Sequence, residues 1–222
     1  MIMKTIVAIH TAMPMVEPTR ELFKKHLPDV RLINIMDESL IQDIIRVGDV
    51  PVSVKKRLIS YYYAAIDAGA DVIFNTCSSV GDVALLAKEL FDIPLVKIDD
   101  AMAMEAVETA SRIGVLATLP TTLGPTVRLL RHFARLMNKN VAITEGLAEG
   151  AFEAVLAGDQ SKHDQLILEA AKNMASKVDL FVLAQGSMTR MENQLADSTG
   201  KKVLSSPERG VLAVKKLIEQ TD

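Results

Sequence analysis

The chain has 222 residues, and its 25 basic and 28 acidic side chains give a net charge of −3. Because there is no excess of basic residues to neutralise phosphates, we expect no nucleic-acid partner. Hydrophobic residues make up 49% of the chain and charged residues 24%, which is typical of globular proteins and excludes a mainly disordered chain.

Short runs rich in β-branched residues alternate with longer stretches that have apolar residues at helical spacing. Several of the short runs are apolar without alternation, as expected for strands that helices cover on both faces. The pattern predicts an α/β protein with mainly parallel sheets flanked by helices. Strands are predicted at residues 5–9, 30–34, 72–75, 95–98, 112–117, 139–143 and 180–184. Helices are predicted at residues 18–26, 52–68, 79–90, 102–111, 123–138, 150–157, 160–176, 188–195 and 208–219.

Two segments about a hundred residues apart have the same design. Residues 70–79 and 178–188 each form an apolar strand that runs into small polar residues at the start of a helix. This repeat predicts two similar α/β lobes. We expect the first lobe over residues 1–100, with residues 205–222 returning to it, and the second over residues 101–204.

The sequence predicts neither a membrane span nor export. No window of 18 apolar residues occurs, and the apolar run near the N-terminus is too short for the core of a signal peptide. The single cysteine, Cys77, cannot form a disulfide within the chain, which favours a reducing compartment. We therefore expect a cytoplasmic protein with no membrane partner.

The cysteine lies where a ligand is expected, because open α/β sheets bind ligands beyond the carboxyl ends of their strands. Cys77 follows the predicted strand 72–75 and is expected to open the next helix, a position that lowers the pKa of a thiol. Asn75, Thr76, Ser78 and Ser79 surround it with short polar side chains that can bind an anion. The alternative is a structural cysteine that behaves as a small hydrophobe.

A second polar strand end follows residues 112–117. Thr118, Thr121 and Thr122 place hydroxyls and amides before a helix, which suits a carboxylate or phosphate. A threonine at such a position can equally be an ordinary N-cap. The spacing leaves both roles open.

The first and the last of the longer strands also end in polar residues. His10 and Thr11 close the first strand, where a histidine could polarise a ligand or influence the cysteine, or could make only a local hydrogen bond. Gln185, Gly186 and Ser187 close the late strand. The glutamine can bind a carboxylate and the glycine lets a ligand approach the backbone, whereas the alternative is a plain strand–helix turn.

The sequence predicts no metal site. His26, His132 and His163 are scattered over helical stretches without the spacing of metal ligands. There is also no glycine-rich phosphate loop and no nucleophile elbow.

Four segments, at residues 74–79, 114–118, 145–152 and 182–188, together resemble the aspartate/glutamate/hydantoin racemase superfamily over most of the chain. The resemblance implies two similar lobes with the active site between them. It also implies a small carboxylate substrate, catalysis without a cofactor, and a homodimer. Racemases of this family use two cysteines, one from each lobe, to remove and return the α-proton on opposite faces of the substrate.

The resemblance makes Cys77 the cysteine of the first lobe, and places His10 near an aspartate that assists this cysteine in glutamate racemases. The second cysteine should fall at Gln185 or Gly186, and neither can exchange a proton through its side chain. The resemblance further implies that a group of strand-end residues holds the substrate carboxylate: Asn75, Thr76, Ser78, Thr118 and Thr121.

A single cysteine leaves three hypotheses open. The first is a cofactor-independent racemase or isomerase of a small carboxylate, in which Cys77 transfers the proton and His10 or a bound water serves the other face. The second is a decarboxylase or cis–trans isomerase that uses Cys77 as proton donor or nucleophile. The third is a carboxylate-binding protein without catalysis.

Overall fold

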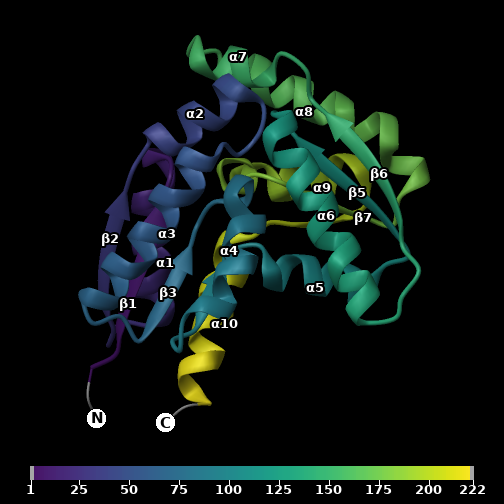
Figure 1. Cartoon of the computed structure of the whole chain (residues 1–222). Helices are drawn as coiled ribbons and strands as arrows, with labels where there is room; N and C mark the ends of the chain where they lie inside the picture. The colour runs from purple at the N-terminus through teal and green to yellow at the C-terminus, as the bar shows by residue number, and fades with distance from the viewer. Residues whose placement is uncertain (1–2, 221–222) are drawn as a thin grey trace. The chain divides into compact units, whose positions relative to one another are not determined.

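A computed structural model describes residues 3–220. The chain forms two compact units, which can be followed by their colours in Figure 1. The first unit contains the described residues up to Asp99 and those from Pro207 onward, and the second is Asp100–Ser206. The second unit is therefore inserted, along the chain, between two parts of the first.

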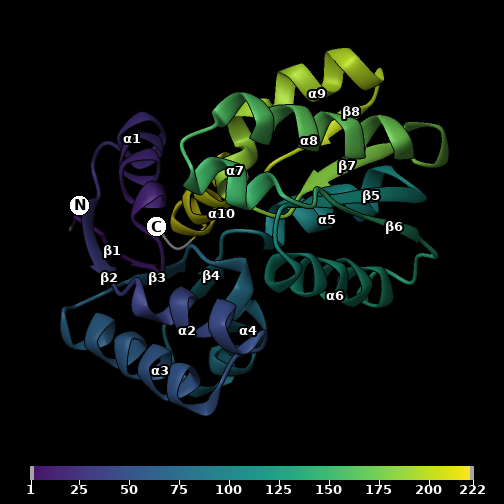
Figure 2. The ribbon, with the colours of Figure 1, turned by 90° about the horizontal axis from the view of Figure 1, so that it is seen from above.

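The first unit has a four-stranded parallel sheet in the order β2-β1-β3-β4. Its central strand β1 is buried over its whole length, because helices cover both faces of the sheet. The strands are β1 (Thr5–His10), β2 (Arg31–Met36), β3 (Val72–Asn75) and β4 (Leu95–Lys97). One face carries α1 (Val16–His26) and α10 (Pro207–Glu219), and the other carries α2 (Ser39–Val47), α3 (Val52–Asp67) and α4 (Gly81–Ala87), as Figure 2 shows.

Helix α10 approaches β4 closely. Its buried face, with Val211 and Val214, packs against the sheet beside Phe23 of α1. At Gly210 a methyl group would lie 2.7 Å from the carbonyl oxygen of Ile98, a distance that no side chain tolerates. This glycine therefore allows the helix to lie directly on the end of β4.

The second unit repeats this architecture, with a parallel sheet in the order β6-β5-β7-β8. The strands are β5 (Arg112–Ala117), β6 (Ala142–Leu147), β7 (Leu180–Leu183) and β8 (Lys202–Leu204). One face carries α5 (Asp100–Thr109) and α6 (Pro120–Leu136), and the other carries α7 (Ala151–Leu156), α8 (Gln160–Met174) and α9 (Glu192–Thr199), as Figure 2 shows. Short 3₁₀ segments join these elements: η1 (Met13–Met15), η2 (Ser78–Val80), η3 (Lys88–Leu90), η4 (Ala175–Lys177) and η5 (Gly186–Met191).

The predicted fold class is confirmed, since each unit is a parallel sheet flanked by helices. Two elements were not predicted: α2, and β8, which is only three residues long. The sixth strand spans Ala142–Leu147 rather than residues 139–143. The helix predicted at residues 188–195 is divided into η5 and α9. Within residues 3–220, none of the helices has both the length and the apolar character needed to cross a bilayer.

Candidate functional site

Cys77 lies at the carboxyl edge of the first sheet, directly beyond β3. Its backbone is extended, with φ −122° and ψ 118°, and it precedes the 3₁₀ turn η2 rather than a regular helix. The helix α4 begins four residues later, at Gly81. The prediction that Cys77 opens a helix is therefore corrected: the thiol faces the amides of a tight turn, which come before the helix itself.

The surroundings of the Cys77 sulfur act on its pKa in opposite directions. Burial raises the pKa of the thiol, and it outweighs a hydrogen bond from the Thr11 hydroxyl and hydrogen bonds from the backbone amides of Val80 and Ser79. The expected lowering of the pKa is thus absent in the protein without substrate, because the residue is half-buried against the apolar core of the first unit. The resting form at neutral pH is the thiol, with donors already directed at the position of the charge.

The Ser79 hydroxyl is also near the sulfur and favours the thiolate. Ser79 is 3% exposed, and its Oγ has no partner at normal hydrogen-bonding geometry. We therefore regard the backbone amides and Thr11 as the principal donors, because their hydrogen bonds act on the thiolate directly. A buried hydroxyl without a partner beside a thiol is a group that a bound ligand can satisfy.

His10 is fully buried at the end of β1, beside β3. Its Nε2 is 2.9 Å from the Oδ1 of Asn34, and its Nδ1 is 3.0 Å from the Oγ1 of Thr76. Burial lowers the pKa of His10, and the hydrogen bond that its Nε2 donates to the Asn34 amide oxygen only partly opposes this effect. The ring is therefore neutral at pH 7, with both nitrogens engaged, and it holds Thr76 at the end of β3.

A buried tyrosine fixes the backbone at the cysteine. The Tyr62 hydroxyl donates to the Oδ1 of Asn75 over 3.1 Å, and the Nδ2 of Asn75 donates to the carbonyl oxygen of Cys77 over 3.0 Å. Burial and the charge of a Cys77 thiolate both raise the pKa of Tyr62, so the phenol stays a donor. Sequence reasoning missed Tyr62, although a tyrosine on the apolar face of a helix must find a polar partner.

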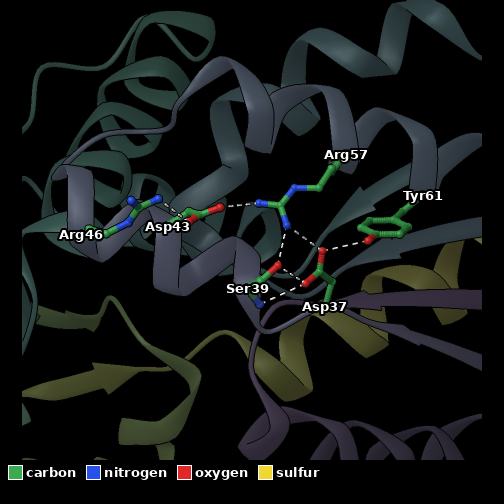
Figure 3. Close-up of polar contacts among 6 residues, drawn as sticks. All are labelled: Asp37, Ser39, Asp43, Arg46, Arg57 and Tyr61. Carbon is green, nitrogen blue, oxygen red and sulfur yellow. Dashed lines mark hydrogen bonds and ion pairs between the residues drawn. The ribbon is translucent and has the colours of Figure 1, made fainter.

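A second polar network, drawn in Figure 3, ties β2 to the two helices that follow it. The amide of Asp37 donates to the His10 carbonyl over 3.1 Å. The Asp37 carboxylate accepts from the Tyr61 hydroxyl over 2.8 Å and from the amide of Ser39 over 3.0 Å, and pairs with Arg57 at 3.3 Å. Burial opposes the ionised form of Asp37, but these contacts together hold the pKa of its carboxyl below the ordinary value.

This network holds α2 and α3 against the end of β1, where His10 is the last residue of the strand and Thr11 follows it. Arg57 extends the network to Asp43 through an ion pair of 2.6 Å. No sequence motif marks the network, because its members are spread over the loop after β2 and two helices. The network therefore helps to fix the end of β1, which leads to Thr11 beside the cysteine.

The second unit has its own polar strand ends, at β5 and β7. The Oε1 of Gln185 accepts from the amide of Thr118 over 2.7 Å, and its Nε2 donates to the hydroxyl of Thr118 over 2.8 Å. The two strands are neighbours in the sheet, so their ends meet. Gln185 stands where a second cysteine was expected. Its side-chain amide is therefore already engaged in two hydrogen bonds within its own unit.

The start of α6 leaves polar groups free for a ligand. Thr121 Oγ1 is buried without a hydrogen-bond partner. Pro125 lies inside the helix and has no N–H, so the Thr121 carbonyl lacks its usual helical donor. No threonine caps this helix, since the N-cap position is Leu119 and Thr122 donates to the Leu119 carbonyl over 2.9 Å.

The remaining predicted site residues are placed less centrally. Gly186 is half-buried at the start of η5, Ser187 is exposed, and Ser78 is half-buried in η2. Within each unit the strand ends bring together Cys77 with Thr11 and Ser79, and Thr118 with Gln185. Over the described part of the chain, no group of three or more His, Cys, Asp or Glu side chains could hold a metal ion.

The sequence profile of the Asp/Glu/hydantoin racemase family matches residues 6–214. The chain belongs to this family. Racemases are isomerases, so membership places the chain in that class of enzyme. No curated protein is similar enough in sequence to count as a match.

Solved structures of racemases share the fold of this family member. A glutamate racemase from Francisella tularensis, solved with D-glutamate, is 13% identical with a TM-score of 0.75, over 98% of this chain and 82% of that one. An aspartate racemase from Picrophilus torridus is 15% identical with a TM-score of 0.72, over 96% and 93%. An allantoin racemase from Klebsiella pneumoniae is 20% identical with a TM-score of 0.69, over 98% and 89%. At these identities the likeness establishes the fold alone.

Proposed function

We propose that the chain is a cofactor-independent racemase or isomerase of a small carboxylate, and that Cys77 is its acid/base. The observation that carries the proposal is the convergence of one hydroxyl and two backbone amides on the sulfur of the chain's single cysteine. A structural cysteine in an apolar core does not require such donors. A thiol that gains and loses a proton does require them, because the charge on sulfur must be stabilised in a buried place.

The proposed reaction begins when the resting Cys77 thiol loses its proton to solvent and the resulting thiolate takes the proton from the carbon next to the substrate carboxylate. The substrate is then an enolate-like anion, and the cysteine is a thiol. Ser79, whose buried hydroxyl lacks a partner at normal geometry, is proposed to donate to a carboxylate oxygen as its charge grows. Thr121, whose hydroxyl is also buried without a partner, is proposed as a carboxylate-binding group of the second unit. The other predicted binding residues are proposed to contact substrate as well, Thr11, Asn75, Thr76 and Ser78 from the first unit and Thr118, Gln185, Gly186 and Ser187 from the second.

The second proton transfer decides between racemisation and one-sided exchange. Gln185 cannot supply a proton, and the neutral His10 ring has both nitrogens in hydrogen bonds. We therefore propose a positioning role for His10, through Thr76, and a water molecule as the proton source for the opposite face. Return of the proton by Cys77 to the same face would give exchange without inversion.

The test is an incubation of the protein with small carboxylates in deuterium oxide, followed by proton NMR and analysis of product stereochemistry. Aspartate, glutamate, malate and several sugar acids form the panel. We expect deuterium at the α-carbon with the unmodified protein. Cys77→Ala should lower the rate at least about a hundredfold, since a positioned general acid/base contributes roughly 10²–10⁴.

Ser161→Ala is the matched control, because Ser161 is exposed on α8 in the second unit. It should exchange as fast as the unmodified protein. Equal rates for Cys77→Ala and the control would sink the acid/base role. Carbon dioxide release or a trapped thioether would replace the proposal by the decarboxylase or the cis–trans isomerase, and binding of a carboxylate by both variants without turnover would favour a binding protein.

We further propose that the protein acts in the cytoplasm as a homodimer. The absence of a second cysteine in the chain and its single half-buried thiol fit a reducing compartment. Exposed apolar side chains near the end of α2 and the start of α3, Ile45, Val47 and Val52, suit a contact with a second copy. Sedimentation of the protein tests this, and a monomer at micromolar concentration would contradict it.

A further inference from the structure

A lysine is buried at the end of β4, where no step of the proposed reaction uses it. Lys97 and Asp99 are each 2% exposed, and the Nζ of Lys97 is 3.5 Å from the Oδ1 of Asp99. Lys97 lies beside Asn75 in the register of the sheet, on the strand next to the one that leads to the cysteine. Lysine and aspartate are rarely buried to this degree, because the loss of hydration is costly even for a pair.

The chain makes room for this lysine with a glycine in α4. A methyl group on Gly81 would lie 3.0 Å from the Cε and 3.3 Å from the Nζ of Lys97. The backbone of Gly81, with φ −58° and ψ −35°, is ordinary for a helix, so glycine is not needed for its conformation. Alanine would be the better helix former at this position. The absence of a side chain at Gly81 therefore leaves room for the end of the Lys97 side chain.

The placement is also unfavourable for the helix, because α4 begins at Gly81 and a positive charge opposes the dipole at a helix start. The cost of burying Lys97 and its unfavourable interaction with the helix dipole are both offset if the lysine stabilises a negative charge nearby. The residues directly before Gly81 are Ser79 and Val80, whose amides donate to the Cys77 sulfur. The end of Lys97 thus lies against the residue that directly follows the turn facing the Cys77 sulfur.

We propose that Lys97, held by Asp99 behind Gly81, is a positioning residue that stabilises the negative charge of Cys77 during proton transfer. This inference rests on the proposed role of Cys77 as acid/base. Lys97 does not touch the substrate in this account. It acts through the turn that begins at Ser78, and through its charge.

Other titratable groups face the cysteine and must be separated from this effect. Tyr62 on α3 is coupled to the thiolate and stays protonated, and His10 at the end of β1 is neutral. Asp82 lies exposed in the first turn of α4. None of these groups changes in the variants below, so any change in the titration of the thiol is due to the buried pair.

The experiment measures the rate of alkylation of Cys77 by iodoacetamide as a function of pH, with Cys77→Ala as the blank. Because the chain has one cysteine, every modified thiol is Cys77. In Lys97→Met the apparent pKa of the thiol should rise, and the alkylation rate below that pKa should fall about tenfold for each unit of the rise. In Asp99→Asn a buried negative charge that opposes a nearby thiolate is removed, so the apparent pKa of the thiol should fall and the rate should increase.

The opposite directions are the decisive result. A structural role for the pair would loosen the turn in both variants and move both rates the same way, which would overturn the proposal, as would two unchanged pH profiles. If Lys97→Met does not fold, Asp99→Asn decides alone: a faster reaction supports the proposal, and an equal or slower one contradicts it. Alkylation needs no substrate, so opposite shifts without deuterium exchange would reject the proposed function while retaining the role of Lys97.

Discussion

Two glycines inside helices should respond to alanine very differently. At Gly210 of α10 the new methyl group would lie 2.7 Å from the Ile98 carbonyl oxygen and 2.9 Å from the Ile98 Cα, both backbone atoms of the strand edge. The helix must then move away by roughly 0.7 Å to restore ordinary contact near 3.4 Å. We expect a loss of about 2 kcal/mol in the free energy of unfolding, since overpacking costs about 1–3 kcal/mol and outweighs the gain in helix propensity.

Gly124 of α6 is the matched control, since apart from its chain neighbours a methyl group there would approach the Nη1 of Arg128 alone, at 3.2 Å. Arg128 is exposed and its long side chain can move aside. Gly124→Ala should therefore change the free energy of unfolding by less than about 1 kcal/mol, because the gain in helix propensity is opposed by crowding against the ring of Pro125.

Urea titration is the assay, and the chain offers a probe for one unit. All three tyrosines, Tyr61, Tyr62 and Tyr63, lie on α3 in the first unit, and the chain has no tryptophan. Tyrosine fluorescence therefore reports the unfolding of the unit that contains Gly210, and circular dichroism reports both units. A Gly210→Ala protein as stable as the original, or an equal loss in Gly124→Ala, would refute the packing argument.

Two further predictions concern groups around the cysteine. Tyr62→Phe leaves the buried Oδ1 of Asn75 without its donor and should lower the free energy of unfolding by about 1–3 kcal/mol in urea titration. Tyr63→Phe, at a residue that is 52% exposed, should change it hardly at all. Equal effects of the two substitutions would contradict the role of the Tyr62 hydroxyl. Because the pKa of His10 is lowered in the folded protein, the unfolded chain binds more protons, and stability should decline as the pH falls below about 6.5. His10→Gln should show less of this decline in thermal melts between pH 7 and 5. An unchanged dependence of stability on pH in the variant would contradict the prediction.

The fold class could be predicted because the strands are buried on both faces. Continuous apolar runs such as residues 72–75, separated by helical stretches, leave few alternatives to a covered parallel sheet. The helix α2 could not be predicted in this way. Its start depends on the side chain of Asp37 and on contacts with Arg57 of α3, which join residues that are distant in sequence.

Part of the candidate site could also be predicted from the sequence, because the fold is a parallel sheet. Strand ends in a parallel sheet share one edge, so Cys77 and Thr11 could be grouped from the sequence, and the structure brings them into contact. The ionisation of the thiol could not be foreseen, because burial depends on packing around the turn. Lys97 was also missed, since a lysine at the end of a short strand usually signals an exposed edge.

The insertion of the second unit between β4 and α10 has a consequence for how the protein is made. The residues of the second unit are contiguous, so on the ribosome this unit can fold as soon as it emerges. The first unit begins earlier but finishes later, because α10, with Val211, Val214 and Ile218, supplies part of the cover for one face of its sheet. Until that helix arrives, part of the sheet that bears Cys77 is an open apolar surface, and the half that starts first is the half most exposed to misassembly.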